Sequence, residues 1–420
     1  MPSPAKHILI IGGGVIGLSA AYFCSRRGFR VTVIDRNGPL RDGCSFGNAG
    51  MIVPSHFVPL AAPGMVALGL KWMWNPRSPF YIKPRLSWDL LSWAYRFWRA
   101  STKQHVERAA PLLRDLHLAS RACYEKLADD WGDSFELKLH GLLMLCKLPH
   151  TLDEESHTAE KARQLGMPAE VHDAAGTAKL DPDVRMDVHG SVFFPRDCHL
   201  SPQRLMAGYQ ARLIDAGATF VWNADVNGFD LNDRRVTRVK TSVGDFEADE
   251  IIIAGGSWSP SLGKMLRLSL PMQAGKGYSL TVKTPRQLPK ICSIFTEARI
   301  AVTPMGGTLR FGGTMEIAGL NEKISPQRVQ GIIDAVPRYY PDFSAEDFAG
   351  IEPWRGLRPC SPDGLPYLGR AKRYENLIVA TGHAMMGLSL APITGELVSK
   401  MVSGEAVGMD LGMLLPDRFG

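Results

Sequence analysis

The sequence lacks the features that mark disulfide-rich, metal-binding, membrane-spanning and nucleic-acid-binding proteins. Its seven cysteines are an odd, scattered set without CxxC spacing, which argues against a disulfide framework, a zinc site or a dithiol redox centre. No stretch approaches the roughly 18 consecutive apolar residues of a transmembrane helix, and the opening MPSPAKHILIIGGG lacks the apolar region and cleavage site of a signal peptide. The net charge of +6 comes without long runs of like charge. We expect no metal, no nucleic-acid partner and a reducing, cytoplasmic location.

What the sequence does contain is enough apolar residues for a large core. With 45% apolar and 21% charged residues, a chain of 420 residues predicts roughly two to three domains. Residues 7–11 are typical of a short buried strand, 15–27 of a helix of small and apolar residues, and 30–34 of a second strand. This order makes a βαβ unit, which is expected in a parallel sheet.

The residue pattern changes several times farther along the chain. Residues 54–84 are rich in Pro, Gly, Met and Trp, and α/β character returns over 201–256. We predict further helices over residues 85–100, 104–130, 153–165 and 386–402, and antiparallel strands over residues 278–283, 299–304 and 308–313. The alternation predicts a cofactor domain built from separated segments, with a second domain inserted between them.

Residues 12–17, GGGVIG, satisfy the GxGxxG pattern of dinucleotide-binding turns, and Asp35 ends the following strand. In this pattern Gly12 permits the tight turn, Gly14 lets the backbone approach a pyrophosphate, and Gly17 allows the helix to pack closely on the strand. The helix N-terminus offers unpaired N–H groups to the phosphates. Asp35 would accept hydrogen bonds from the ribose hydroxyls.

The fingerprint alone does not separate NAD from FAD. Residues 43–50, GCSFGNAG, follow the second strand and place small residues with hydroxyl and amide groups where a longer cofactor would continue. That favours a buried flavin; an ordinary Gly/Asn loop is the alternative.

Four separated motifs resemble one family of flavoproteins. They are GGGVIGLSAAY with VTVID, then CSFGNAG, then IIIAGGSWSP, and finally GLRPCSPDGLPYLGR followed by NLIVATGHAMMGLSLAPITGEL. In this order, over residues 7 to about 400, they are similar to the D-amino acid oxidase-like FAD superfamily, and within it to the bacterial D-amino acid dehydrogenase small subunits. The resemblance implies an α/β (α+β overall) fold. A discontinuous Rossmann-like FAD-binding domain would comprise residues 1–55, 195–265 and 350–420, and an inserted antiparallel-sheet substrate domain would comprise residues 56–194 and 266–349.

The resemblance also implies which residues bind FAD. Val226 would touch the adenine through its backbone, and Cys44 stands where the family usually has threonine. The other expected contacts fall in four segments: Gly12, Gly13, Gly14, Val15, Ile16, Gly17, Asp35 and Arg36; Ser45, Asn48, Ala49, Gly50 and Met51; Gly255, Gly256 and Trp258; and Gly382, Met385, Met386, Gly387 and Leu388. The start of a helix predicted over 387–402 would stabilise negative charge on the reduced flavin.

Three residues are the catalytic candidates. Arg358, in the Gly-Leu-Arg-Pro motif, resembles a clamp for the substrate carboxylate, because a guanidinium can hold a carboxylate through two parallel hydrogen bonds. A structural salt bridge is the alternative role. Tyr278 would meet the substrate's carboxylate or side chain, or belong to the core. His383 would act as a base or proton donor, or pack beside the cofactor; His56 and Glu316 are weaker candidates.

The function that the resemblance implies is FAD-dependent oxidation of a D-amino acid, D-proline and hydroxy-D-proline included. Hydride transfer from Cα to flavin N5 would give an imine, which hydrolyses to a 2-oxo acid and ammonia, and the electrons would pass to a quinone or another acceptor. A glycine- or sarcosine-type amine oxidase that uses oxygen stays open. A pyridine-nucleotide-dependent flavin reductase or monooxygenase should show a second dinucleotide fingerprint or a CxxC, and the sequence has neither. An FAD-bound module without enzymatic activity is the remaining alternative.

Residues 65–99 combine Trp, Met and Leu with basic residues, the composition of a surface that touches anionic lipid, where a quinone would be available. This segment predicts a peripheral contact with the inner face of the membrane. The same aromatic residues would also suit the core of a substrate domain, and general burial preferences favour that interpretation.

Overall fold

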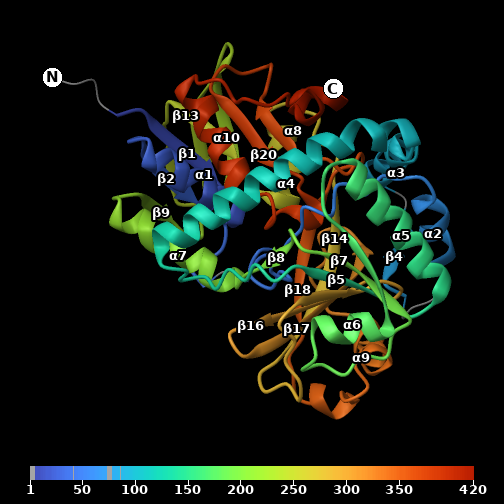
Figure 1. The fold of residues 1–420 in the computed structure, drawn as a ribbon. Helices are drawn as coiled ribbons and strands as arrows, with labels where there is room; N and C mark the ends of the chain where they lie inside the picture. The colour runs from blue at the N-terminus through green and yellow to red at the C-terminus, as the bar shows by residue number, and fades with distance from the viewer. Residues whose placement is uncertain (1–4, 41, 73–77, 86) are drawn as a thin grey trace.

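The computed structural model describes residues 5–40, 42–72, 78–85 and 87–420, which form two principal sheets (Figure 1). The first is six-stranded, and all neighbouring strands in it are parallel except the pair β19–β20. Its strands in spatial order are β19 (Tyr367–Arg370), β20 (Leu377–Thr381), β13 (Glu250–Ile253), β1 (His7–Ile11), β2 (Arg30–Ile34) and β9 (Thr219–Val221).

Strand β1 shows why this sheet forms. Ile8 and Ile10 belong to an apolar cluster with helices on one face of the sheet, whereas Leu9 and Ile11 belong to a second cluster on the other face. Because both faces are covered, the strand needs the unbroken apolar run that residues 7–11 supply. The covering helices on the first face include α1 (Val15–Arg26), α7 (Pro202–Asp215) and α10 (Ala391–Ser403).

The second sheet is nine-stranded and mainly antiparallel, and lies below the first in Figure 1. β5 pairs in parallel with β15, and β4 with β17. Its strands in order are β18 (Trp354–Cys360), β14 (Gln273–Val282), β17 (Thr308–Ile317), β16 (Ile300–Met305), β15 (Cys292–Phe295), β5 (Leu142–Cys146), β7 (Gly190–Phe194) and β6 (Glu170–Asp173), with β4 (Phe80–Ile82) beside β17.

The remaining elements cover or connect these sheets. Two small sheets comprise β10 (Val226–Asn232), β11 (Arg235–Thr241) and β12 (Gly244–Phe246), and β3 (Met51–Ile52) with β8 (Cys198–His199). The other helices are α2 (Met65–Trp72), α3 (Trp88–Ala100), α4 (Lys103–Trp131), α5 (Pro149–Gln164), α6 (Ala174–Leu180), α8 (Ser259–Met265) and α9 (Pro326–Tyr339). Among the described residues, no helix is both long and apolar enough to cross a bilayer.

Helix α4 runs across the molecule and fastens the segment that leads into α10 (Figure 1). His117 Nδ1 lies 2.8 Å from Ser389 Oγ, the Ser120 hydroxyl donates to the carbonyl of Ser389 at 2.6 Å, and the Tyr124 hydroxyl donates to the carbonyl of Leu388 at 2.6 Å. These groups are buried, so the segment before α10 is held firmly in place.

The predicted fold class is confirmed, since both an α/β layer and a mainly antiparallel sheet are present. The predicted domain boundaries stay a prediction. One strand within the expected C-terminal cofactor segment, β18, is hydrogen-bonded to β14 in the larger sheet.

The last helix was predicted from residue 386, but α10 begins at Ala391, after a 3-10 turn at Ala384–Met386. Pro392 explains the difference. Proline has no N–H to donate to the carbonyl four residues earlier, so it fits only in the first turn of a helix, where that hydrogen bond is not needed. The positive end of this helix is therefore farther along the chain than the predicted position at residue 387.

Candidate functional site

The turn between β1 and α1 has the geometry of a dinucleotide-binding turn. Gly12 has φ +116°, and a Cβ there would lie 2.5 Å from the carbonyl oxygen of Ala254. A Cβ at Gly17 would overlap the backbone of Gly12, so both positions require glycine. A Cβ at Gly14 would meet only Ser45 Oγ, at 3.5 Å. The space beside Gly14 is thus left for a ligand that approaches the backbone.

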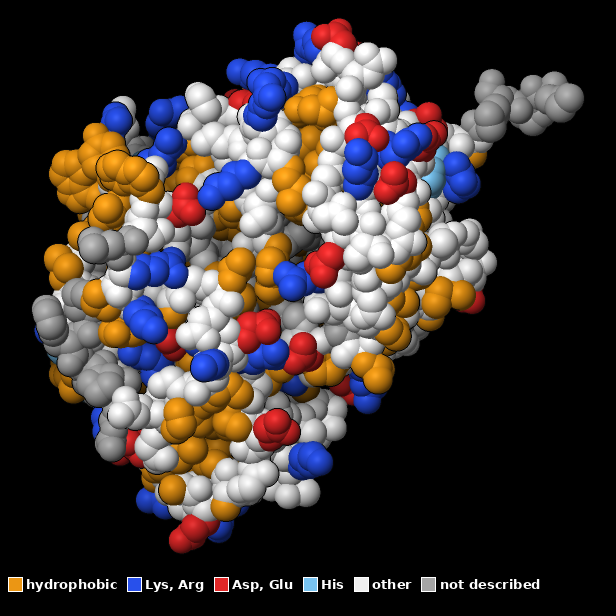
Figure 2. Space-filling view, turned by 180° about the vertical axis from the view of Figure 1, so that it is seen from behind, with side chains coloured by type: hydrophobic (Ala, Val, Ile, Leu, Met, Phe, Trp, Pro, Cys, Tyr) orange, Lys and Arg blue, Asp and Glu red, His pale blue; other side chains and the backbone are white. Residues whose placement is uncertain are grey.

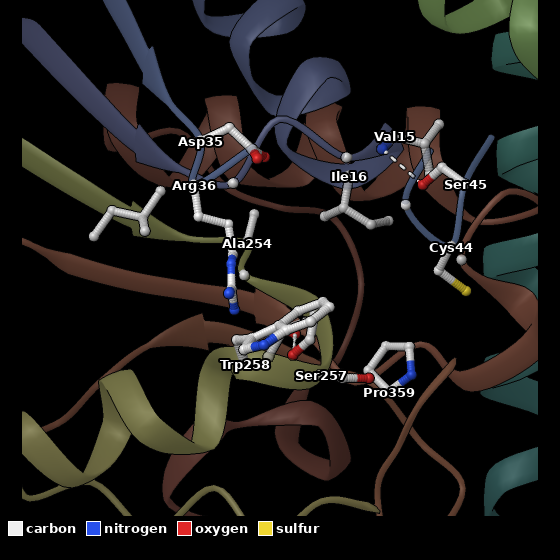
Figure 3. Close-up of a pocket in the computed structure, with 18 of the residues that line it drawn as sticks. Val15, Ile16, Asp35, Arg36, Cys44, Ser45, Ala254, Ser257, Trp258 and Pro359 are labelled. Atoms are coloured by element: carbon white, nitrogen blue, oxygen red, sulfur yellow. Dashed lines mark hydrogen bonds between the residues drawn. The ribbon is translucent and has the colours of Figure 1, made fainter. Parts of the chain in front are cut away.

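Asp35 and Arg36 lie at one end of this site, as Figure 3 shows. Asp35 follows β2, and its Oδ2 accepts a hydrogen bond from the backbone N–H of Gly13 at 2.6 Å. The guanidinium of Arg36 lies over the Trp258 ring, 4.8 Å from its centroid. A carboxylate held beside the glycine turn is the arrangement that binds a ribose in nucleotide-binding sheets.

A cavity of about 330 Å³ extends from this end along the carboxyl ends of β1, β2 and β13. Ligands of open parallel sheets bind at that edge. Cys44 and Pro359 lie at the end of the cavity opposite Asp35 (Figure 3). Most of the predicted cofactor residues line it: Gly12, Gly14, Val15, Ile16, Asp35, Arg36, Cys44, Ser45, Asn48, Val226, Gly255, Gly256, Trp258, Gly382, Gly387 and Leu388.

The other predicted cofactor residues lie outside the cavity wall: Gly13, Gly17, Ala49, Gly50, Met51, Met385 and Met386. Sequence reasoning missed several residues that do line it, among them Met206, Ala224, Asp225, Ser257, Leu357, Pro359 and Thr381. Thr381 could have been found, because it ends β20, and residues at the carboxyl ends of parallel strands face this edge. Met206 belongs to α7, and the sequence carries no signal for it.

The loop over residues 43–50 is held against the turn by its own side chains. Ser45 Oγ accepts a hydrogen bond from the backbone N–H of Val15 at 3.1 Å, the dashed line in Figure 3. Asn48 Oδ1 accepts from the backbone N–H of Gly50 at 2.9 Å. Arg310 Nη1 donates to the carbonyl of Asn48 at 2.8 Å, and burial lowers the pKa of Arg310 to about 10. A buried cation therefore supports the loop that lines the cavity.

Arg358 lies on β18, whose strand partner is β14; its neighbours Leu357 and Pro359 line the cavity, whereas Arg358 itself is not one of the lining residues. Gly275 lies opposite Arg358 in the register, and Arg358 Nη1 donates to the carbonyl of Thr314 on β17 at 2.7 Å. Its side chain therefore crosses over β14. A Cβ at Gly277 would overlap the guanidinium. Glycine at position 277 is what lets the arginine lie across the sheet.

The surroundings of Arg358 differ from those of its neighbour Arg355. Arg355 pairs with the carboxylates of Asp42 and Glu322. Within the described ranges no carboxylate pairs with Arg358, whose guanidinium donates to the carbonyl oxygen of Thr314. Burial raises the pKa of the Cys44 thiol, and the charge of Arg358 opposes that rise, so the guanidinium acts on the Cys44 end of the cavity. Arg358 has the charge that an anionic ligand needs.

Tyr278 faces away from Arg358. Successive residues of a strand point to opposite faces, and Gly277 faces the guanidinium. The Tyr278 hydroxyl donates to Glu316 Oε2 at 2.7 Å, and the ring packs in the apolar core of the larger sheet. Burial is the main cause that raises the pKa of Tyr278. A catalytic role for Tyr278 or Glu316 stays a prediction, and this geometry does not support it.

His383 lies between the main cavity and a second one. The second cavity, about 190 Å³, shares His383 and Ala384 with the first and is otherwise lined mostly by apolar side chains, together with His56. Burial lowers the pKa of His56 to about 4 and that of His383 to about 3, so both rings are neutral at pH 7. His383 Nδ1 has no hydrogen-bond partner among the described residues, while Nε2 lies 3.1 Å from Thr394 Oγ1. A ring with so low a pKa is a weak base.

The residues on either side of His383 also need their particular backbone. Gly382 has φ +78°, and a Cβ there would come within 2.7 Å of the Tyr367 ring. Ala384 has φ +47°, an uncommon conformation for a residue with a Cβ. The strand end of β20 therefore turns sharply where it meets the cavity.

Comparisons with known proteins agree with this site. Residues 7–401 match the model of the family described as DAO, FAD dependent oxidoreductase. The D-amino acid dehydrogenase of Granulibacter bethesdensis is 32% identical over 98% of this chain and 99% of its own length. The D-amino acid dehydrogenase of Helicobacter pylori is 31% identical over 99% of each chain.

Solved structures show the same fold at lower identity. The glycine oxidase from Geobacillus kaustophilus has a TM-score of 0.80 at 23% identity, with 99% of this chain and 100% of that chain covered. The L-proline dehydrogenase from P. horikoshii has a TM-score of 0.73 at 17% identity, covering 99% and 98%. The family match spans nearly the whole described chain, and the cavity has the glycine turn and the carboxylate of a dinucleotide-binding site. This chain therefore belongs to the DAO family of FAD-dependent oxidoreductases.

Proposed function

We propose that this enzyme oxidises a D-amino acid with an uncharged side chain and passes the electrons to a quinone or another carrier. The observation that supports the proposal best is Arg358, a cation without a carboxylate partner in the described structure, at the Cys44 end of the cofactor cavity. An amino acid carboxylate would supply the missing anion through two parallel hydrogen bonds. The curated relatives are named D-amino acid dehydrogenases, which supports the D configuration.

The bound cofactor supplies the two-electron oxidation, and the glycine turn, Asp35, Arg36, Ser45 and Trp258 would hold it. Arg358 would fix the carboxylate and thereby orient the Cα–H bond of the substrate. Its positive charge also opposes protonation of the nearby amine, and oxidation requires the neutral amine. The product is an imine, which water hydrolyses to a 2-oxo acid and ammonia.

The second cavity supports an uncharged side chain. The described residues of its wall include no carboxylate, lysine or arginine, and the two histidines in it are neutral at pH 7. A charged side chain would lose its hydration there without gaining an ionic partner. The volume of about 190 Å³ gives room for an aliphatic side chain or a proline ring, which glycine and sarcosine do not have.

The test is anaerobic reduction of the bound flavin, which is monitored by the loss of its absorbance at about 450 nm. D-alanine, D-leucine, D-proline and cis-4-hydroxy-D-proline should reduce it, whereas D-glutamate, D-lysine and L-leucine should reduce it at least tenfold more slowly. Reduction by glycine or sarcosine alone would replace the proposal with the amine oxidase alternative, and reduction only by NADPH would replace it with the flavin reductase.

The acceptor is tested on the same reduced enzyme. Air should reoxidise it slowly and a soluble quinone analogue quickly. Fast reoxidation by air with formation of hydrogen peroxide would identify an oxidase and refute the acceptor part of the proposal.

A further inference from the structure

Helix α3 carries a stripe of large apolar side chains that point away from the protein. Trp88, Leu91, Tyr95 and Trp98 follow helical spacing along one face, and Trp88 and Trp98 are 84% and 61% exposed. Large aromatic side chains on a soluble helix normally point inward. The core interpretation of these residues therefore fails for the stripe, although it holds for two other residues of the same helix.

Those two residues, Leu90 and Trp93, fix the helix from its other side. Both are buried in a small apolar cluster with Cys360 and Ala384. Trp93 Nε1 donates to the carbonyl of Cys360 at 2.9 Å. Because the helix is anchored in this way, the stripe cannot turn inward without breaking a buried hydrogen bond.

Helix α2 adds to the same apolar edge. Its sequence, MVALGLKW, is almost wholly apolar, yet Gly69 is its one buried residue, and Leu70 is 59% exposed. A Cβ at Gly69 would crowd Phe80, which packs against the cluster that also holds α3. We call the exposed parts of α2 and α3 together the α2–α3 face. Figure 2 shows hydrophobic side chains gathered at the edge where Figure 1 places α3, with Lys and Arg side chains beside them.

The charge of the chain is concentrated in this part of the sequence. Residues 65–103 contain seven lysines and arginines and a single acidic residue, Asp89, a surplus of six that equals the net charge of the whole chain, +6. The rest of the chain is therefore balanced. Among the described basic residues of the segment, the exposed ones are Lys71, Lys83, Arg99 and Lys103.

We propose that the α2–α3 face docks on an anionic lipid bilayer, lying in its interface without crossing it. Trp and Tyr prefer the boundary between water and hydrocarbon, and exposed Lys and Arg are attracted to anionic headgroups. An amphipathic helix with an aromatic face and basic flanks binds in this manner. A second copy of the chain is a poorer occupant, because a two-fold contact would bring the same basic surplus against itself.

Docking would bring the membrane close to the site. Trp93 bonds Cys360, and Arg358 lies two residues earlier on the same strand. A carrier dissolved in the bilayer would thus arrive one helix away from the substrate clamp. Only this last step, the identity of the carrier, rests on the proposed function; the docking itself does not.

The experiment is flotation of the FAD-loaded enzyme with two kinds of vesicle, one of phosphatidylcholine alone and one that also contains phosphatidylglycerol. We expect binding to the anionic vesicles and at least tenfold weaker binding to the neutral ones. The triple variant Trp88→Ser, Tyr95→Ser and Trp98→Ser should lose at least tenfold in binding to the anionic vesicles. Its matched control, Leu139→Ser, Ile214→Ser and Val243→Ser, removes exposed apolar side chains elsewhere and should bind normally.

Two double charge-reversal variants test the electrostatic part of the proposal, the attraction of basic side chains to anionic headgroups. Lys71→Glu with Arg99→Glu should weaken binding to anionic vesicles, whereas Lys161→Glu with Lys179→Glu, an equal charge change at exposed residues of α5 and α6, should not. All variants should keep their flavin, their melting temperature and their reduction by a D-amino acid, so a failure of docking is distinct from a failure of the proposed chemistry.

Two results would overturn the proposal. One is an enzyme that floats with neither kind of vesicle. The other is a dimer, seen by light scattering, that the stripe variant abolishes while vesicle binding is absent, which would make the α2–α3 face a contact between copies of the chain.

Discussion

Replacing Gly277 by alanine separates substrate binding from folding. The new Cβ would overlap the guanidinium of Arg358, which is the far end of a flexible side chain. Since carbon and nitrogen atoms pack at about 3.5 to 4 Å, the guanidinium must move by about 1 Å, and the backbone can stay in place. Alanine in a strand also loses less conformational entropy on folding than glycine does. We therefore expect little change in stability.

The cost should appear in the affinity for the amino acid. Displacing one of two charge-assisted hydrogen bonds to the substrate carboxylate costs about 1.5 to 3 kcal/mol. At about 1.4 kcal/mol for each factor of ten, Kd should rise by about 10- to 150-fold. The maximal rate of flavin reduction should fall as well, because a misplaced carboxylate misplaces the Cα–H bond.

Stopped-flow reduction of the flavin at increasing D-leucine concentration measures both quantities. The matched control is Gly312→Ala on β17 of the same sheet, where a Cβ would meet its nearest neighbour, the Ala49 Cβ, at an ordinary 3.8 Å. An unchanged Kd in Gly277→Ala, or an equal rise in Gly312→Ala, would refute the idea that Gly277 positions Arg358 for the carboxylate.

Three further outcomes are expected. Gly14→Ala should bind FAD much more weakly, by flavin retention on gel filtration, while the melting temperature of the apoprotein stays within a few degrees of wild type, because its Cβ meets only Ser45. Gly17→Ala should lower both FAD binding and the melting temperature, because its Cβ overlaps the backbone of Gly12. Equal behaviour of the two variants would contradict the assignment of Gly14 to cofactor binding and of Gly17 to folding. Stability should fall from pH 6.5 toward pH 4, by about 2 kcal/mol or more in urea titrations, because the unfolded chain binds protons at buried histidines that the native state leaves neutral. Burial lowers the pKa of His56 to about 4 and of His117, His199 and His383 to about 3. It raises the pKa of Asp197 to about 7 and also raises the pKa values of Glu155 and Asp181, so these three carboxyls oppose the trend. A flat profile would show that these rings do not stay neutral.

Local patterns in the sequence predict the cofactor end of the molecule well. Residues 7–34 contain a strand buried on both faces, a glycine turn and an aliphatic helix, and each is specified by neighbours within a few residues. The same holds for Asp35, whose place at the end of β2 puts its carboxylate beside Gly13. Motifs of this kind need no knowledge of the rest of the fold.

The substrate end depends on contacts between distant segments, which local patterns do not show. In the sequence, Tyr278 has the chemistry expected of a residue that contacts the substrate. In the structure, the alternation of side chains along β14 points it toward Glu316 instead. Among the described residues Arg358 has no carboxylate partner, whereas Arg355 on the same strand pairs with Asp42 and Glu322, a difference that depends on contacts between distant segments. The outward stripe of α3 likewise follows from Trp93 being the side chain that reaches Cys360.

The strand order of the six-stranded sheet also determines when, during synthesis, the sheet can be completed. β1 and β2 are made long before β20, which lies between β13 and β19 and contributes Ala380 and Thr381 to the cavity wall. β13 must therefore wait for its partner β20, and the cavity wall is complete only after both strands have been made. We therefore expect FAD to be loaded only after β20 has been made, so a flavin shortage would leave apoprotein in the cell.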